Sequence, residues 1–529
     1  MTSAWKLLQG FHVRGPMSTE TRTVKSARNM IVGLTTQAIL VLLGFASRGV
    51  FVTELGVGFV GVNSLLLSIL AVLGVTDLGL NGALIFALYK PLSVGDSDRV
   101  SALVRFCASM YRYVALAVAL IGLALLPFLG RLVSLDIKSE ELYAYYLVLL
   151  INSVGGYLMA YRAILLQADQ RAYVASLYSF AFNATRYVVQ IAALLVLRSY
   201  LLFLIIQVVF TLLNNLAIFR HVGKRYPYLR GNRTKLDGTE RRIIFASVRA
   251  MFIYRIGDMI LNNTDPILIS AIVGTVALGY YSNYTLIVGA ILMFTEILFN
   301  SLIASVGSMV VASNETQRRD VLNELVLFAG WIFGFLTIAF LVLSSEFIGL
   351  WIGGQFVVGQ VVVTGIALNF LMNGMTAPIW AFRQSTGLFR QTRYVLLVTA
   401  ALNVGLSVVL GRHFGVAGIV FATAISRLLT NYWYEPLILH RRYLGGGASK
   451  YFAKQIVVMG LVACSSLGLA NAMSHLPVGG WFLAMKAVAV LVVVNALFLC
   501  FTWRTPEFRR IRRRLSLVFD TLFSREPTR

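Results

Sequence analysis

Charged residues are scarce in this sequence. Only 13% of its 529 residues are Asp, Glu, Lys or Arg, whereas 58% are hydrophobic. Soluble domains usually contain about 25% charged residues, so a soluble fold is excluded. Apolar runs of roughly 20 residues, the length that an α-helix needs to cross a bilayer, recur along almost the whole chain. Strands of a transmembrane barrel would instead alternate polar and apolar residues. The sequence therefore predicts an all-α, polytopic membrane protein.

Residues typical of catalytic and metal sites are few and scattered. The three cysteines form no CxxC pair and the five histidines lie far apart, so we expect neither a disulfide nor a metal site. A Walker A motif is missing. Gly56–Gly61 fits the dinucleotide-binding pattern G-x-G-x-x-G, but it lies between two apolar runs rather than between a strand and a helix. We expect no cofactor and no catalytic residue.

Fourteen apolar segments are predicted to cross the membrane. Their expected ranges are 30–52, 62–86, 113–134, 142–165, 173–197, 201–219, 250–273, 281–304, 325–345, 357–381, 393–411, 416–438, 453–473 and 481–502. The corresponding divisions are an N-terminal segment (1–28), a six-helix bundle (29–219), a basic linker (220–249), a second six-helix bundle (250–440), two additional spans (441–503) and a basic tail (504–529).

Basic residues outnumber acidic ones, 46 to 22, and concentrate on alternate loops. With a cytoplasmic N-terminus, 37 Lys and Arg residues fall on the cytoplasmic side and four on the opposite side. This bias predicts that both termini, the linker 220–249 and the tail are cytoplasmic.

Because the charge is spread over loops rather than gathered on a soluble domain, we expect no nucleic-acid partner. The basic tail suits an amphipathic helix on anionic lipid.

The two halves of the chain contain matching motifs. Gly56-x4-Gly61-x2-Ser64 recurs 218 residues later as Gly274-x4-Gly279-x2-Ser282. Ala160-Tyr161-Arg162 with Tyr173-Val174 recurs at an offset of 221 as Ala381-Phe382-Arg383 with Tyr394-Val395. Each copy lies at the same expected span and membrane side of its half. Six spans per half is an even number, so the halves are expected to be parallel repeats around a central cavity.

The seventh expected span contains costly polar residues. Each charge inserted at the bilayer centre costs on the order of 3 kcal/mol. Arg255, Asp258, Asn262 and Asp265 nevertheless fall within an arc of about 80° on one helix face. Pro266 follows and is expected to kink the helix. The sequence thus predicts that this face meets polar partners rather than lipid.

Four other expected spans also place polar residues at helical spacing. These residues are Gln37 and Arg48 in the first span, Asp77 and Asn81 in the second, Glu296 and Asn300 in the eighth, and Arg427, Asn431 and Glu435 in the twelfth. They fit either of two interpretations, namely pairs that hold neighbouring helices together or the lining of a shared, water-filled cavity.

Four stretches resemble one known family. They are LGVGFVGVNSLLLSILAVLGVTDLGLNGALIFALYKPLS (55–93), NNTDPILISAIVGTVALGYYSNYTLI (262–287), PIWAFRQSTGLFRQTRY (378–394) and GVAGIVFATAISRLLTNYWYEP (415–436). They are similar to segments of Wzx-type lipid-linked oligosaccharide flippases, bacterial polysaccharide transporters of the MOP superfamily. The resemblance covers roughly residues 25–445.

The resemblance implies a transporter of the bacterial cytoplasmic membrane that is not an enzyme. It would move undecaprenyl-diphosphate-linked oligosaccharide outward by alternating access, in contact with polysaccharide polymerase machinery. The expected substrate-binding residues are Arg48, Arg255, Arg427, Asn262 and Asn431, with arginine suited to phosphate. The expected cavity acids, which would orient those cations or couple transport to protons or sodium, are Asp77, Asp258, Asp265, Glu296 and Glu435.

Two other functions remain open. A cation-coupled multidrug antiporter would share the architecture but would favour an acidic cavity. An integral membrane glycosyltransferase or polymerase would depend on Asp136, Glu140 and Glu141, the acidic residues of one short outer loop.

Overall fold

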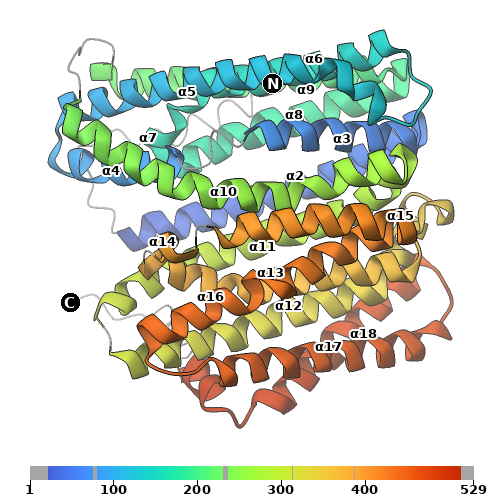
Figure 1. The fold of residues 1–529 in the computed structure, drawn as a ribbon. Helices are drawn as coiled ribbons and strands as arrows, with labels where there is room; N and C mark the ends of the chain where they lie inside the picture. Colours follow the sequence, from blue (N-terminus) through green and yellow to red (C-terminus); the bar gives the residue numbers. More distant parts are fainter. Residues whose placement is uncertain are drawn as a thin grey trace, which may run out of the picture.

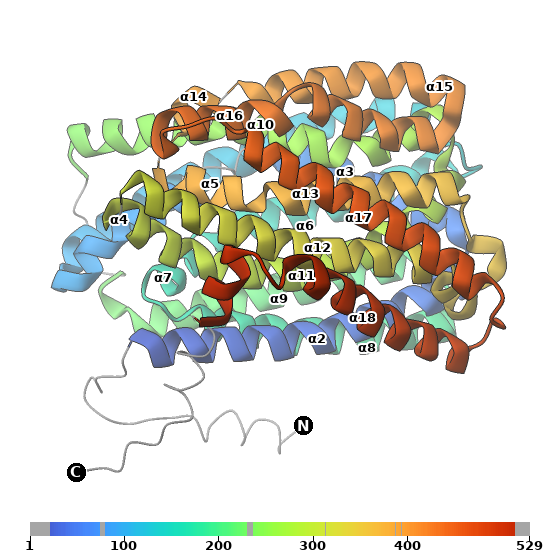
Figure 2. The ribbon, with the colours of Figure 1, turned by 90° about the horizontal axis from the view of Figure 1, so that it is seen from below.

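A computed structural model describes residues 22–74, 80–229, 236–312, 314–386, 388–392 and 394–513 of the chain. Within these ranges the regular elements are all helical, and the long helices run side by side along one common direction (Figure 1, Figure 2). The all-α fold class is therefore confirmed.

The helices have the following bounds. They are α2 (Arg22–Leu55), α3 (Val57–Leu73), α4 (Leu80–Val94), α5 (Ser97–Leu125), α6 (Ser139–Ala160), α7 (Ala163–Ala168), α8 (Ala172–Leu197), α9 (Tyr200–Arg225), α10 (Gly238–Ile272), α11 (Thr275–Ala312), α12 (Glu315–Trp351), α13 (Gln360–Thr386), α14 (Phe389–Thr392), α15 (Val395–Leu429), α16 (Asn431–Leu439), α17 (Ser449–Ser474) and α18 (Gly480–Thr502). A π-helical turn, His440–Leu444, extends α16.

Eleven helical segments in the described ranges are long and apolar enough to cross a membrane. The predicted total of about fourteen follows from three further features. Two shorter helices, α3 and α4, together cover the second expected span. The charged α10 covers the seventh, and the segment Val395–Leu444, counted once, contains both the eleventh and the twelfth. The eleventh and twelfth spans meet at Gly415, whose φ of 60° breaks the helical path of α15.

Several element bounds differ from the sequence prediction. Helix α10 begins at Gly238 rather than at residue 250, so the expected linker 220–249 contains its first three turns. Helix α10 also continues through Pro266 as one helix to Ile272. The predicted twelfth span is divided at Thr430, whose φ of −131° and ψ of −97° separate α15 from α16. Arg427, before this break, and Glu435, after it, therefore do not share one continuous helix face.

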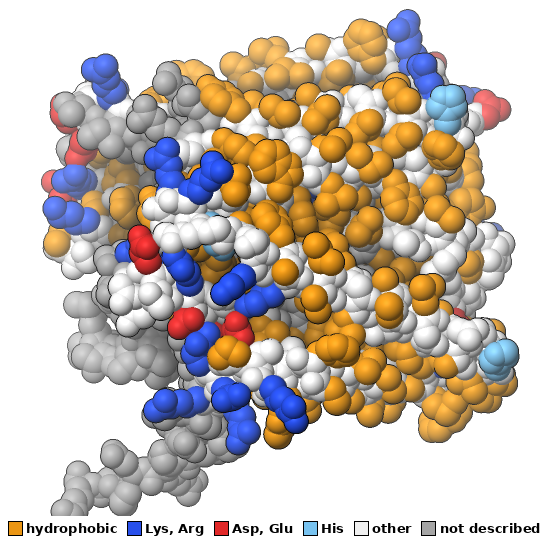
Figure 3. All heavy atoms as spheres, turned by 60° about the horizontal axis from the view of Figure 1, so that its bottom comes forward, with side chains coloured by type: hydrophobic (Ala, Val, Ile, Leu, Met, Phe, Trp, Pro, Cys, Tyr) orange, Lys and Arg blue, Asp and Glu red, His pale blue; other side chains and the backbone are white. Residues whose placement is uncertain are grey.

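The surface supports a membrane-spanning protein. Apolar side chains cover the length of the helices, and Lys and Arg side chains gather towards one end (Figure 3). Large residues such as Phe86, Ile456 and Trp481 are at least 69% exposed, as expected where lipid rather than water surrounds the chain. One arginine of the predicted lipid-binding tail, Arg510, binds Asp320 and Glu324 of α12 at 3.1 and 2.9 Å. Residues 514–529 of the tail lie outside the described ranges.

The two copies of the glycine motif contact each other directly. A Cβ atom on Gly61 of α3 would lie 1.9 Å from the Thr275 carbonyl oxygen, and one on Gly279 of α11 would lie 2.2 Å from that of Val57. Under the 218-residue offset, Gly61 corresponds to Gly279 and Val57 corresponds to Thr275. The two contacts are therefore the same contact made once from each half. Between them, Ser64 Oγ donates to Ser282 Oγ at 2.8 Å. Such reciprocal contacts are those of a two-fold interface, so the repeat motif marks where the halves touch.

Further hydrogen bonds close the same end of the molecule. Ser270 Oγ donates to the Leu132 carbonyl at 2.6 Å, and the Thr275 amide donates to Ser134 Oγ at 2.8 Å. Leu132 and Ser134 belong to the first half of the chain, and Ser270 and Thr275 to the second. This end, which the charge distribution predicts to face outward, is therefore held shut by close backbone contact and side-chain bonds.

We predict that Gly61→Val separates α3 from α11, because no side chain fits against the Thr275 carbonyl. In a chain without its native cysteines, Ser64→Cys with Ser282→Cys should form a disulfide under mild oxidation. Adding Gly61→Val should lower its yield severalfold by mass spectrometry of the linked peptides. Gly289→Val on α11 is the control, since a Cβ there has no heavy atom within 4 Å. Unchanged yield with Gly61→Val would contradict the contact.

Candidate functional site

The polar arc of α10 faces α15. Asp265 is only 7% exposed, and its two carboxylate oxygens accept from Thr423 Oγ1 at 3.1 and 2.9 Å. Thr423 Oγ1 in turn accepts from Asn403 Nδ2 at 2.8 Å. Asn403 and Thr423 lie on opposite sides of the Gly415 break, so this chain of hydrogen bonds joins three spans: the seventh, eleventh and twelfth. A buried carboxylate is tolerated in hydrocarbon only with such partners.

Arg427 extends the network one turn beyond Thr423. Its guanidinium donates to Asn262 Oδ1 of α10 at 3.1 Å and approaches Asn373 Oδ1 of α13 at 3.5 Å. Arg427 is 9% exposed, so its charge is held inside the protein by amide oxygens on two other helices. Asp265 lies close enough to contribute a favourable charge.

The other end of the arc is open. Arg255 Nη1 lies 3.5 Å from the Asp258 carboxylate, and both side chains are about two-fifths exposed, at 40% and 37%. Asp258 also accepts from Asn262 Nδ2 at 3.1 Å. We call Arg255, Asp258, Asn262, Asp265, Asn373, Asn403, Thr423 and Arg427 the α10–α15 polar cluster. At one end of this cluster Asp265 is buried and hydrogen-bonded through both carboxylate oxygens. At the other end Arg255 is accessible and makes only a long ion pair among the described residues.

Glu435 and Asn431 have different surroundings. Glu435 binds Arg383 of α13 at 2.7 Å, and the two side chains are only 9% and 2% exposed. Glu435 therefore balances a buried cation, although Asp258 is near enough to interact with it electrostatically. Asn431 begins α16 directly after the break at Thr430, and its buried Oδ1 has no hydrogen-bond partner among the residues that the structure describes. The structure brings neither residue into a hydrogen bond with the polar cluster.

The remaining predicted residues lie apart from the cluster or outside the described ranges. Arg48 on α2 is partly buried near the phenols of Tyr187 and Tyr200, and no carboxylate of the described residues pairs with it. Glu296 on α11 is exposed. Asp77 falls in residues 75–79, which the structure does not describe.

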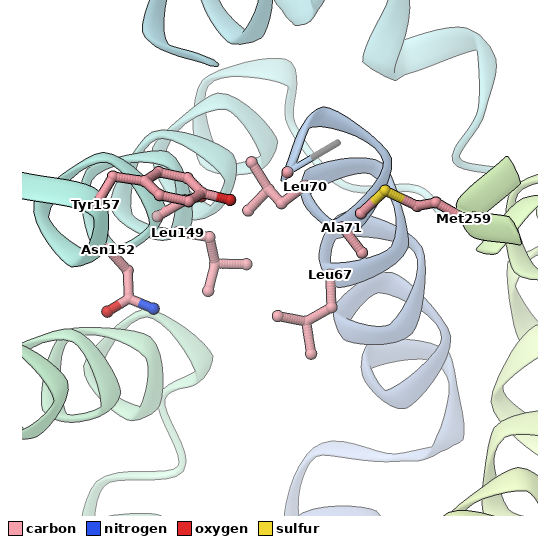
Figure 4. Close-up of a pocket in the computed structure, with 9 residues that line it drawn as sticks. Leu67, Leu70, Ala71, Leu149, Asn152, Tyr157 and Met259 are labelled. Carbon is pink, nitrogen blue, oxygen red and sulfur yellow. The ribbon is translucent and has the colours of Figure 1, made fainter. Parts of the chain in front are cut away.

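A cavity of about 390 Å³ adjoins α10 between α3 and α6 (Figure 4). Its lining consists of Leu67, Leu70, Ala71 and Gly74 from the end of α3, Leu149, Asn152, Ser153 and Tyr157 from α6, and Met259 from α10. Met259 follows Arg255 by four residues, which is one helical turn and about 40° around the helix axis. The open end of the polar cluster and the cavity therefore lie on neighbouring parts of one face.

The polar wall of this cavity was not predicted from the sequence. Asn152, Ser153 and Tyr157 interrupt an apolar run that was predicted only as the fourth span. Their polarity in that run was a detectable signal. In the part of the chain that the structure describes, no group of three or more His, Cys, Asp and Glu side chains could hold a metal ion.

Three solved structures share this fold. The chain is 13% identical to the lipid II flippase MurJ in an inward closed conformation, with a TM-score of 0.62 over 90% of this chain and 100% of that one. It is 12% identical to an inward-facing multidrug resistance MATE family transporter of the MOP superfamily, with a TM-score of 0.56 over 78% and 98%. A MATE protein in the bent conformation is 11% identical, with a TM-score of 0.54 over 79% and 96%.

No protein-family model matches the sequence, and no curated protein matches it either. At identities of 11–13%, the structural likeness establishes the fold. The chain is thus a multi-pass membrane protein with the fold of MOP-superfamily transporters.

We predict that Thr423→Val destabilises the protein by about 2 kcal/mol, because it removes a hydrogen bond from a buried carboxylate. Thermal unfolding of the detergent-solubilised protein measures the loss. Thr337→Val is the matched control, since the buried Thr337 hydroxyl donates only to the Phe333 carbonyl of its own helix, at 2.6 Å. If both variants unfold at the same temperature, Thr423 does not hold Asp265 in place.

Proposed function

We propose that this protein is a flippase that moves undecaprenyl-diphosphate-linked oligosaccharide from the inner to the outer leaflet by alternating access. The resemblance of four segments to Wzx-type flippases supports this substrate. The fold supports transport, because MurJ, a flippase for lipid II, shares it over 90% of this chain.

The observation that carries the proposal is the pairing of an accessible cation with an adjacent cavity. Arg255 is 40% exposed, and among the described residues its one ion-pair partner is Asp258, at the long distance of 3.5 Å. A planar guanidinium in this state suits a diphosphate, which can accept two parallel hydrogen bonds. The cavity beside Met259 offers both apolar and hydrogen-bonding walls. A lipid-linked sugar diphosphate needs both kinds of surface.

The other predicted residues take supporting roles in the proposal. Asp258 would hold Arg255 until the diphosphate displaces it, and Arg48 would add a second cation from the first half of the chain. Arg427 and Asn262 would orient the substrate at the edge of the cluster. Asp265 is the strongest candidate for coupling to protons or sodium, because it is a buried carboxylate that joins three spans.

The proposed setting is the bacterial cytoplasmic membrane, with both termini in the cytoplasm. The end closed by Gly61 and Gly279 would then face outward. In this orientation the structure corresponds to a state whose outer side is shut, from which loading would take place at the inner leaflet.

A cation-coupled drug antiporter is the competing function, since MATE transporters have the same fold. A buried carboxylate such as Asp265 would suit it. The three arginines Arg48, Arg255 and Arg427 disfavour it, because an antiporter for cationic drugs needs an acidic binding surface. Drug accumulation in cells without other efflux pumps separates the two functions.

We predict that Arg255→Ala abolishes translocation of the lipid-linked oligosaccharide while leaving the protein folded. The side chain is half-exposed and makes one long ion pair, so its loss removes substrate contact rather than packing. Translocation is measured in proteoliposomes by the accessibility of labelled glycan to an external glycosidase. Arg255→Lys should retain part of the activity, since it keeps the charge but not the fork.

Arg198→Ala is the matched control for this test. Arg198 is 71% exposed and binds Glu54 at 2.8 Å at the opposite end of the helices, so its removal should leave translocation unchanged. Wild-type rates in Arg255→Ala, at equal protein levels, would remove Arg255 from the proposed site.

A further inference from the structure

The cavity beside α10 has two walls of different chemistry. The α3 and α10 side is apolar, formed by Leu67, Leu70 and Met259 among others. The α6 side carries an amide from Asn152 and a phenol from Tyr157 (Figure 4). Ser153, also on α6, adds a hydroxyl to this side. Its volume of about 390 Å³ lies within the range of small-molecule sites in proteins.

Two of these polar groups have no hydrogen-bond partner. Among the described residues, nothing bonds to the side chains of Asn152 and Ser153, and Asn152 Oδ1 is also buried from solvent. Buried polar atoms in folded proteins are paired in the great majority of cases. Asn152 lines the cavity, and its side-chain amide carries both a donor and an acceptor. The α6 wall therefore has hydrogen-bonding capacity that the protein itself does not use.

The internal repeat shows that this capacity is particular to the first half. Asn152 lies 221 residues before Asn373, the offset of the second repeated motif, and both residues lie on the fourth span of their half. Asn373 faces the guanidinium of Arg427 at 3.5 Å. No arginine bonds to Asn152 among the described residues. The same position thus contributes to the polar cluster in one half and lines the cavity in the other.

The cavity and the Arg255 cation lie at neighbouring positions along α10. Met259 contributes to the cavity, and Arg255 lies one turn away on nearly the same face of α10, about 6 Å along the axis. A group that is covalently attached to a diphosphate bound at Arg255 reaches the cavity without a linker. In the proposed substrate, either the first sugar or the first isoprene unit is attached there.

We propose that this cavity binds the sugar residue nearest the diphosphate, with Asn152 and Ser153 bonding to its hydroxyl groups. The proposal rests on the proposed function and assigns the glycan subsite within it. A sugar ring has an apolar face for Leu67, Leu70 and Met259 and a rim of hydroxyls for the α6 wall. An isoprene unit would satisfy neither Asn152 nor Ser153, so the polar wall favours the sugar.

The test compares two lipids that differ only in the glycan. The full-length protein in nanodiscs is titrated with undecaprenyl-diphosphate-linked oligosaccharide purified from the source cells, and separately with undecaprenyl diphosphate. The ratio of the two dissociation constants isolates the glycan contribution. We expect the wild type to bind the glycosylated lipid at least tenfold more tightly, and Asn152→Ala and Ser153→Ala each to reduce this ratio severalfold.

Asn214→Ala on α9 is the matched control, because Asn214 Oδ1 is likewise buried without a partner but does not line the cavity. It should keep the wild-type ratio. Arg255→Ala should weaken both lipids equally, which tests the diphosphate site separately from the glycan subsite.

Three results would overturn the glycan subsite while leaving the proposed function intact. They are a wild-type ratio near one, an unchanged ratio in both Asn152→Ala and Ser153→Ala, or an equal loss of both lipids in those variants. The last result would assign the cavity to the lipid part or to packing. Wild-type protein that binds neither lipid would instead contradict the proposed function itself.

Discussion

Hydrocarbon offers no hydrogen-bond partners, so every polar group between these helices must find one inside the protein or face a water-filled space. This constraint organises the second half of the chain. Asp265 meets Thr423, Thr423 meets Asn403, and Arg427 meets Asn262, so charges that would oppose membrane insertion instead join three spans. At Arg255, by contrast, the one ion pair among the described residues is long, at 3.5 Å, and the side chain is 40% exposed. The transition from buried, hydrogen-bonded polar groups to an exposed one along a single helix is what marks the proposed site.

The internal repeat determines how the two halves contact each other, and the differences between the halves determine where polar groups are available. Reciprocal contacts of Gly61 and Gly279 with the opposite half bring α3 and α11 together at one end. Away from this contact the halves diverge, because Asn373 is engaged by an arginine and Asn152 is not. A cavity with polar capacity in the first half therefore borders, at Met259, the helix of the second half that carries Arg255. A substrate bound between them would contact both halves, which is the arrangement that alternating access requires.

Sequence periodicity predicted the arc of α10 well, because a single continuous helix obeys a 100° spacing. It failed for Arg427 and Glu435, because the helix breaks between them at Thr430. Neither a glycine nor a proline stands at or next to Thr430 in the sequence to predict this break. Thr423, Asn403 and Asn373 were missed because their partners lie on distant spans, which helical spacing within one span does not reveal. The domain limits remain predictions, whereas the number of spans and the all-helical class followed from apolar run lengths alone.

Leaflet transfer by the purified protein tests the central claim most directly. Proteoliposomes that contain the wild-type chain and fluorescent undecaprenyl-diphosphate-linked oligosaccharide are exposed to a membrane-impermeant glycosidase, and the protected fraction is followed over time. Our account predicts that the initially protected inner pool becomes accessible in the presence of the protein and stays protected in protein-free vesicles. An inner pool that stays protected with folded protein, under both a proton and a sodium gradient, would contradict it.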